Sequence, residues 1–410
     1  MSKTSVKKRL NHLLFSIILV TFSFVIIECF SIGGLCVLGK WKKLKYIPIP
    51  DVLLNKKQNE VIRKLIAGEA GHAEYNSYLG WSPRAQAKTE QYQINSQSIR
   101  SVDEYSDTPS REKIRIAAFG DSFTFGQGVT NDETWEHHLS LLNPRYEILN
   151  FGVGGYGQDQ AYLRYLDEGQ TYRPDIVIIG FISENVFRNV NTFRPFYNPL
   201  TEFPLTKPRF KLDGEEIELI ENPMKDLREY ELLLNQPKKT IRQLGQHDYF
   251  YHQLYHRGPL DNLAFLRLLK VLIYNLSSKD RYESLFFKDD IFNKQSEGYQ
   301  LAVKIIDQFY KKSEENGSIP LIVILPTKRD LSRLKAGVQK RYRPFIGYWE
   351  EMRYHVLDVN ELVFREGIDV LQAQWYTEDG HNSGLMNQKI ARHLHDYLKE
   401  VEILKGDYAQ

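Results

Sequence analysis

The chain shows two hydrophobic patterns, one long apolar run near its start and a series of short apolar runs further on. Residues Leu13 to Leu38 form the long run, which has the length of a helix that crosses a lipid bilayer. The short runs begin at Ile114 and alternate with helix-compatible segments. Such alternation is typical of a parallel β-sheet covered by helices. The sequence therefore predicts an α/β domain carried by an N-terminal membrane anchor.

Basic residues flank the long run on both sides, so the positive-inside rule does not fix its orientation. They are Lys3, Lys7, Lys8 and Arg9 before the run, and Lys40, Lys42, Lys43 and Lys45 after it. The run is too long for a signal peptide and lacks a small-residue cleavage site, so we predict an uncleaved single-pass anchor over residues 1–45. Glu28 lies inside it, where a charge costs about 2.5–3.5 kcal/mol. This side chain is protonated, meets a partner helix or is tolerated in a long span.

Residues 46–110 are polar and turn-rich, which predicts a stalk or irregular arm. A domain over residues 111–402 follows, with strands expected at Ile114–Phe119, Tyr146–Phe151, Ile176–Phe181, Ile319–Leu325 and His355–Val359. Helices are expected at Thr134–Leu142, Gln158–Glu168 and Gly298–Glu315, and from the loop after His381 to about Val401. An insertion at about 188–295 interrupts the alternation. It contains a hairpin that turns at Asp213-Gly214, helices near 226–234 and 263–276, and is expected to form a cap.

Composition narrows the choice of function. The formal net charge is +2 without a long basic block, which does not suggest a nucleic-acid partner. Both cysteines, Cys29 and Cys36, lie in the long apolar run, so thiol catalysis in the rest of the chain is excluded. The spacing of His252 and His256, near His247, could suit a metal, but their aromatic neighbours favour a packing segment. We predict neither a metal nor a cofactor.

A glycine turn that carries a serine, Gly120-Asp121-Ser122, follows the first strand of the α/β pattern. A strand, a tight turn and a helix lift a side chain out of the carboxyl end of a parallel sheet, where ligands bind. The same arrangement points backbone N–H groups at an oxyanion formed there. The following helix is expected to begin after Gly128. The alternative is a purely structural role, in which the serine only caps the helix after a glycine turn.

Residues that complete a serine-based acyl-transfer site follow other strands. Such a site needs a nucleophile, an imidazole oriented by a carboxylate, and donors for the oxyanion. Ser122 is the candidate nucleophile and His381 the candidate base. The orienting acid is Asp379 or Glu378, and the donors are the N–H groups of Ser122 and Gly155 with the side-chain amide of Asn185. All of them are expected at the carboxyl ends of strands, so one sheet edge gathers them.

Four blocks resemble the SGNH (GDSL) hydrolase superfamily. They are Gly120-Asp121-Ser122, Asn150-x-Gly152-x-x-Gly155, Asn185 after the third strand, and Asp379-Gly380-His381, in the family's order over about residues 111–400. The resemblance implies a three-layer α/β/α sandwich around a parallel five-stranded sheet. It also implies that Ser122 is the nucleophile, that Gly155 and Asn185 are oxyanion donors, and that His381 is the base.

Two blocks depart from the family pattern. The third usually reads Gly-x-Asn-Asp, whereas this chain has Ser183-Glu184-Asn185-Val186. The fourth is most often Asp-x-x-His, but here Glu378 stands three before His381 and Asp379 two before it. Membrane-associated members that resemble alginate and cell-wall acetylation proteins use Asp-x-His. We therefore favour Asp379 as the orienting acid and hold Glu378 as second choice.

The resemblance implies a serine esterase or O-acyltransferase that hydrolyses or transfers an acyl group, expected to be acetyl, on an envelope glycan or other small ester. It would lie in the bacterial inner membrane through its N-terminal helix, with the catalytic domain on the periplasmic side. The alternative is a non-catalytic, membrane-tethered glycan-binding or scaffold protein on a degenerate SGNH fold. The altered third block favours this alternative, whereas the set Ser122, Asp379 and His381 favours the enzyme.

Overall fold

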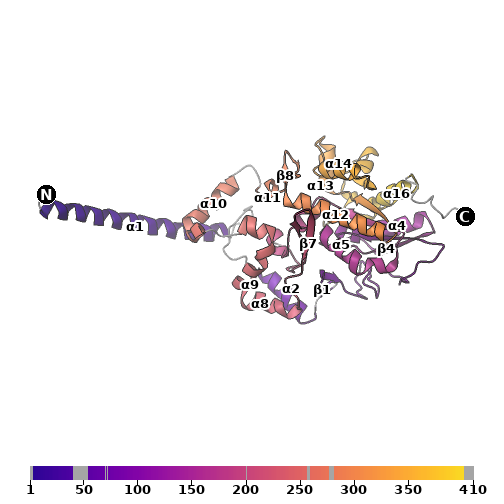
Figure 1. Cartoon of the computed structure of the whole chain (residues 1–410), viewed down its shortest axis with the longest axis horizontal. Helices are drawn as coiled ribbons and strands as arrows, with labels where there is room; N and C mark the ends of the chain where they lie inside the picture. The colour runs from indigo at the N-terminus through magenta and orange to yellow at the C-terminus, as the bar shows by residue number, and fades with distance from the viewer. Residues whose placement is uncertain are drawn as a thin grey trace. The chain divides into compact units, whose positions relative to one another are not determined.

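The computed structural model describes residues 3–39, 54–69, 71, 73–199, 201–255, 259–276 and 281–400. Residue contacts divide the chain into two units, which are described separately (Figure 1). The smaller unit combines Met1–Val52 with Tyr251–Leu285, and the larger combines Leu53–Phe250 with Phe286–Gln410. The basic residues at 40–45, His256 and the expected helix end at Val401 lie outside the described residues. The division at residues 45 and 110 stays a prediction.

A parallel five-stranded sheet forms the centre of the larger unit, which confirms the predicted fold class. Its strands, in spatial order, are β11 (Val356–Asp358), β10 (Ile319–Ile324), β5 (Ile176–Phe181), β3 (Ile114–Phe119) and β4 (Tyr146–Asn150). β3 and β5 are buried at every position, which explains their continuous apolar sequence. The chain passes from β3 to β4 on one side and then to β5 on the other. Such a reversal next to β3 creates the crevice in which ligands of α/β proteins bind.

Helices cover both faces of this sheet. On one face lie α4 (Trp135–Leu142), α13 (Lys328–Lys335), α15 (Val359–Arg365) and α16 (Gly384–Glu400), whose apolar residues share one core cluster with the strands. On the other lie α5 (Gln158–Asp167), α12 (Glu297–Glu315) and α14 (Arg343–Glu351). Aromatic contacts fix this second layer, because Tyr165 packs on both Phe119 and Phe309, and Trp349 packs on Phe181.

Shorter elements complete the larger unit. They are α2 (Lys56–Ile66), β1 (Ala73–Asn76), β2 (Gly80–Pro83), α3 (Ser122–Phe125), α6 (Asn185–Arg188), α7 (Arg194–Tyr197), β6 (Arg209–Asp213), β7 (Glu216–Ile220), α8 (Glu231–Asn235), α9 (Pro237–Leu244), β8 (Phe287–Lys288) and β9 (Ile291–Phe292). The predicted hairpin is present, because β6 pairs antiparallel with β7 around Gly214. The smaller unit holds α1 (Lys3–Gly39), α10 (Ala264–Leu276) and α11 (Arg281–Ser284).

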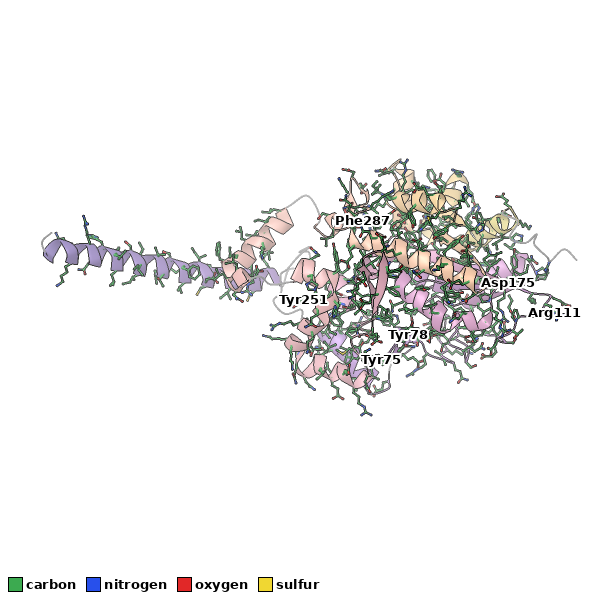
Figure 2. The ribbon with its side chains drawn as sticks, in the orientation of Figure 1. Tyr75, Tyr78, Arg111, Asp175, Tyr251 and Phe287 are labelled. Carbon is green, nitrogen blue, oxygen red and sulfur yellow. The ribbon has the colours of Figure 1, made fainter. Side chains whose placement is uncertain are left out.

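The segment 54–110 is more regular than its sequence indicates. Asn55 caps α2 through a capping box, and β1 pairs with β2 as a hairpin that carries Tyr75 and Tyr78 (Figure 2). The hydroxyl of Tyr75 donates to the carbonyl of Met224 at 2.6 Å, which ties the hairpin to the insertion. Strands of four residues are too short for alternation to be read from the sequence.

Arg100 joins this segment to the loop after the candidate nucleophile. Its Nε donates to Oδ1 of Asn131 at 3.1 Å, its Nη2 donates to the carbonyl of Val129 at 2.6 Å, and its Nη1 donates to the carbonyls of Phe125 and Gly126. Burial lowers the pKa of Arg100 to about 10. One buried guanidinium therefore donates to three loop carbonyls.

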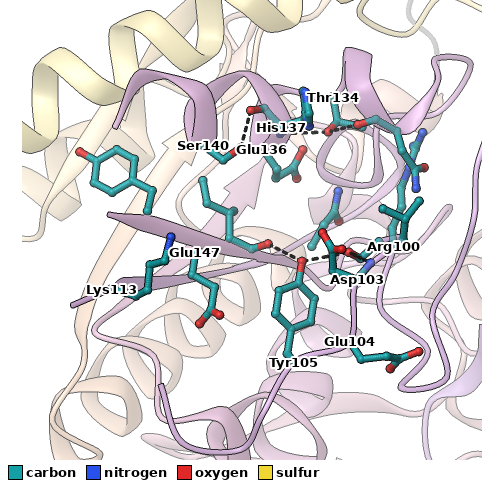
Figure 3. A pocket seen from close by; sticks show the side chains of 16 residues that line it. Arg100, Asp103, Glu104, Tyr105, Lys113, Thr134, Glu136, His137, Ser140 and Glu147 are labelled. Atoms are coloured by element: carbon teal, nitrogen blue, oxygen red, sulfur yellow. Dashed lines mark hydrogen bonds between the residues drawn. The ribbon is translucent and has the colours of Figure 1, made fainter. Parts of the chain in front are cut away.

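A cavity of about 360 Å³ lies beside β4, lined by the segment 100–105, by α4 and by β4 itself (Figure 3). Glu136 is buried in its wall, and neither carboxylate oxygen accepts a hydrogen bond from the described residues. Burial raises the pKa of Glu136, although nearby Arg100 acts in the opposite direction. Neither Ser122 nor His381 lines this cavity, so it is separate from the predicted catalytic residues.

In the smaller unit, α1 contains the stretch Lys7–Leu38, which is long and apolar enough to cross a membrane. Length and composition of this kind are shared by membrane anchors and signal sequences. Cys29 and Cys36 are free thiols on α1.

We predict that Arg100→Met lowers the free energy of unfolding by about 3 kcal/mol or more, because several buried acceptors lose a charged donor. Arg84→Met, in the same segment, is the control, since Arg84 makes one surface hydrogen bond of 3.4 Å to Gly68. This control should stay within about 0.5 kcal/mol of the parent protein. Denaturant unfolding of the purified protein measures both, and equal effects would contradict the role given to Arg100.

Candidate active site

Ser122 begins helix α3 directly after β3, so the turn is tighter than the sequence predicts. The sequence did not predict this short helix, which Asp121 caps by accepting from the N–H of Phe123 at 2.9 Å. The helix expected after Gly128 is present as α4. Helix α3 ends at Gly126, whose φ of 78° lies in the left-handed region. Ser122 is 8% exposed at the carboxyl end of the central strand pair.

The structure brings Ser122 and His381 into contact. Nε2 of His381 lies 2.8 Å from Oγ of Ser122, although 259 positions separate the two residues in the chain. Nδ1 of the same ring lies 3.0 Å from Oδ1 of Asp379, which is an ion-pair distance with an angle outside the hydrogen-bond range. Of the two candidate acids, which are both exposed, Asp379 is the one at this distance from the imidazole.

Hydrogen bonds within the loop that carries His381 stabilise its conformation. The N–H of Thr377 donates to the carbonyl of His381 at 2.8 Å, and the N–H of His381 donates back to Oγ1 of Thr377 at 3.0 Å. The Thr377 hydroxyl also donates to Asp379. Partial burial raises the pKa of Asp379, but the hydrogen bond from Thr377 and the neighbouring His381 outweigh burial and lower it overall. Asp379 is therefore held as a carboxylate beside the imidazole.

Asn150 holds the second glycine turn against helix α3, which carries Ser122. Its Oδ1 accepts from the N–H of Gly152 at 2.9 Å, and its Nδ2 donates to the carbonyl of Thr124 at 3.0 Å. A Cβ added at Gly152 would lie 2.3 Å from the backbone nitrogen of Phe125. Only glycine permits so close an approach of the two turns.

Two backbone N–H groups near Ser122 have no acceptor within the described residues. These are the N–H of Ser122 itself, at the first position of α3, and the N–H of Gly155, whose φ is +84°. Unpaired N–H groups at a helix start and at a glycine turn can receive an oxyanion. Both belong to the predicted donor set.

The third predicted donor, Asn185, is engaged inside the protein. Its Nδ2 donates to Oδ2 of Asp121 at 2.9 Å and to the carbonyl of Tyr156 at 3.1 Å, so both amide hydrogens have acceptors. Its Oδ1 accepts from the N–H of Ile182 at 2.9 Å. The structure thus brings Asn185 to the turn that carries Ser122, where it holds Asp121.

Arg188 lies beside the candidate site, and the sequence did not predict its place there. Its Nη1 donates to Oδ2 of Asp121 at 3.0 Å and to the carbonyl of Tyr156 at 2.9 Å, the same two acceptors that Asn185 uses. Its Nη2 donates to Glu184 at 2.9 Å, and this cation lowers the pKa of Glu184 to about 2. The signal in the sequence is the Glu184–Arg188 spacing of four, which places opposite charges on one helix face.

Arg194 is a second missed residue. Its Nη1 donates to the carbonyl of Gly155 at 2.8 Å, and its Nε donates to Oγ1 of Thr201 at 3.0 Å. Burial, together with the charge of neighbouring Arg188, lowers the pKa of Arg194 to about 10. Arg194 therefore holds the carbonyl of the glycine whose N–H belongs to the predicted donor set. No feature of the insertion's sequence marks this arginine.

Other residues singled out in the sequence lie elsewhere. His247 and His252 belong to no group of three potential ligands within the described residues, and His256 lies outside them. Trp375 and Tyr376 donate from their side chains to the carbonyls of Asp369 and Val370, which anchors the histidine loop.

Residues 118–228 match the sequence model of the GDSL-like lipase/acylhydrolase family. The chain carries a GDSL-like lipase/acylhydrolase domain. The matched segment contains Ser122, Gly155 and Asn185, whereas His381 lies beyond it. A search of curated protein sequences finds no match.

The chain is also similar to several solved structures. A lipolytic protein of the G-D-S-L family from Desulfitobacterium hafniense is 14% identical, with a TM-score of 0.35 and coverage of 70% of this chain and 100% of that chain. A G-D-S-L family protein from Veillonella parvula is 11% identical, with a TM-score of 0.35 and coverage of 70% and 97%. A two-domain esterase active on acetylated mannans is 11% identical, with a TM-score of 0.33 and coverage of 71% and 50%. Similarity at this level carries no argument about substrate.

We predict that Gly152→Ala disrupts the nucleophile turn, because its Cβ would meet the backbone of Phe125 at 2.3 Å. Such overpacking costs about 1–3 kcal/mol and should lower both the melting temperature and esterase activity. Gly154→Ala is the matched control in the same turn, since a Cβ there meets nothing within 4 Å. Thermal unfolding and ester turnover measure the pair, and indistinguishable variants would contradict the close approach.

Proposed function

We propose that the protein is a serine esterase whose nucleophile is Ser122 and whose general base is His381. The 2.8 Å contact between Nε2 and Oγ carries this proposal, because it is the geometry for proton transfer from a serine to an imidazole. Asp379, 3.0 Å from Nδ1, orients the ring and stabilises the imidazolium that forms. The matched GDSL-like family supports an ester-hydrolysing activity.

In the first half-reaction, Nε2 of His381 takes the Oγ proton while Oγ of Ser122 attacks the ester carbonyl carbon. The tetrahedral oxyanion lies between the N–H groups of Ser122 and Gly155, which have no acceptor within the described chain. The C–O bond of the ester then breaks, and His381 returns the proton to the departing alkoxide. The products are an alcohol and an acyl group bound to Ser122.

Asn185 joins as the third donor when one of its amide hydrogens turns from the Tyr156 carbonyl to the oxyanion. Arg188 makes this exchange inexpensive, because it donates to the same Tyr156 carbonyl and the same Asp121 carboxylate. Neither acceptor would be left without a donor after Asn185 moves. The third block of this chain lacks the family's usual aspartate, and Arg188 lies three residues after Asn185 in the same segment. We propose that Arg188 supports Asn185 in place of that aspartate.

In the second half-reaction, His381 takes a proton from an acceptor hydroxyl, which attacks the acyl carbon and releases Ser122. With water the outcome is hydrolysis, and with a sugar hydroxyl it is O-acyl transfer. We propose an acetyl ester of an envelope glycan as the substrate class. We further propose a bacterial inner-membrane location with the domain on the periplasmic side. The analogy with membrane-tethered family members suggests these finer assignments.

Ser122→Ala should abolish turnover of p-nitrophenyl acetate and covalent labelling by a fluorophosphonate, because the variant lacks the hydroxyl proposed to form the acyl-enzyme. Ser183→Ala is the control, since Ser183 lies near the carboxyl end of neighbouring β5 and its hydroxyl has no partner within the described residues. This control should keep both activities. Labelling that survives Ser122→Ala would remove Ser122 from the proposed role.

Asp379→Asn should lower kcat by roughly 10²–10⁴, because an amide cannot stabilise the imidazolium and favours the wrong tautomer. Glu378→Gln should leave kcat almost unchanged, since this exposed acid makes no ion pair with His381. Steady-state kinetics on the same ester compares the two variants. The reverse ranking would assign the orienting role to Glu378.

A further inference from the structure

Helix α10 receives its N-terminal cap from α1. The N–H groups of Ala264 and Phe265 donate to the carboxylate of Glu28 at 2.7 Å and 3.2 Å. Ala264 is the first residue of α10, and the preceding Leu263 has no side-chain acceptor with which to cap it. Glu28, which interrupts the apolar run of α1, therefore supplies what the sequence around α10 lacks.

Glu28 lies deep in the candidate membrane span. A bilayer core accommodates about 20 helical residues, and every such stretch between Leu13 and Leu38 includes Glu28. If α1 crosses the membrane, the start of α10 is therefore within the hydrocarbon layer. Backbone N–H groups there need an internal acceptor, because neither lipid nor water supplies one. The carboxylate of Glu28 gains hydrogen-bond donors, and the first N–H groups of α10 gain an acceptor.

The two helices stay in contact beyond this cap. Ser31 is 5% exposed, and a Cβ added at Gly34 would lie 3.3 Å from the side chain of Leu268. On α10, Ala264 and Val271 are each 1% exposed. Polar and small residues of α1 thus face α10, as is common where helices pack inside membranes.

The opposite side of α10 is an exposed apolar stripe. Its residues recur at helical spacing and are 37–83% exposed, namely Phe265, Leu269, Leu272, Ile273 and Leu276. Lys270 lies on another face of the helix and pairs with Asp261. On α1, apolar side chains such as Ile26 and Ile32 are exposed as well.

We propose that α10 is inserted in the membrane beside α1, with its exposed apolar stripe in contact with the lipid acyl chains of one leaflet. Lipid is the occupant because the buried side of the same helix packs on the candidate span and its first N–H groups bind at the depth of Glu28. The inserted segment belongs to the chain between β7 and β8, so the protein is held by two membrane elements and α1 is retained. This inference concerns attachment and is independent of the esterase proposal.

The test uses the full chain, with Cys29 and Cys36 replaced by alanine, in phosphatidylcholine–phosphatidylglycerol vesicles. A polarity-sensitive fluorophore is attached at Leu272→Cys or, as the control on the same helix, at Lys270→Cys. Lipids with a spin label on the acyl chain should quench the label at 272 strongly and the label at 270 weakly. Aqueous iodide should show the reverse order.

Stronger quenching at 272 by iodide than by lipid would overturn the proposal. Protection of that label from both quenchers would also overturn it, because it would indicate that protein covers the stripe. Glu28→Leu should reduce the lipid quenching at 272, since the first N–H groups of α10 lose their acceptor inside the bilayer. Glu28→Gln keeps one acceptor oxygen and should preserve most of the quenching, and equal effects of the two variants would contradict the capping role.

Discussion

The candidate site depends on a contact between residues from nearly opposite ends of the α/β domain. Oγ of Ser122 and Nε2 of His381 meet at 2.8 Å because a strand end and a C-terminal loop converge on the same edge of a parallel sheet. Burial of β3 and β5 along their full lengths fixes where the serine emerges. The hydrogen bonds between Thr377 and His381 fix the direction of the imidazole. The buried strands position Ser122 and the loop hydrogen bonds position His381, and the contact between the two residues needs both.

Segments that are distant in the sequence hold the turn that carries the candidate nucleophile Ser122. Arg100 binds the carbonyls at the end of α3, Asn150 holds the second glycine turn against it, and Arg188 holds the capping Asp121. These partners come from the segment before the sheet, from β4 and from α6. Their common effect is to keep a short helix, which has few internal hydrogen bonds, in one position. Preorganisation of this kind matters most for a group that must meet its base at hydrogen-bond distance.

Sequence pattern alone predicted the sheet and the residues near Ser122. Runs such as Ile114–Phe119 and Ile176–Phe181 are buried strands with the predicted bounds, because buried parallel strands need continuous apolar sequence. The pairing of Ser122, His381 and Asp379 could be proposed because each follows a strand or closes the pattern. Arg188 and Arg194 could not be found in this way, since their roles depend on carbonyls that the fold brings to them. Helix α2 and the β1–β2 hairpin were missed because short elements carry little periodicity. The sequence left three alternatives open for Glu28, and one of them was a partner helix. The contact between Glu28 and the start of α10 favours that alternative, and the sequence alone could not show it.

The most direct test of the central proposal is to trap the covalent intermediate. Protein mixed with p-nitrophenyl acetate is quenched with acid during turnover and digested, and the peptides are analysed by mass spectrometry. We expect one acetyl group on the peptide that contains Ser122, and its near-complete loss in His381→Ala, which lacks the base. Hydrolysis without an adduct on Ser122, or an adduct of equal amount in His381→Ala, would contradict the proposed serine–histidine mechanism.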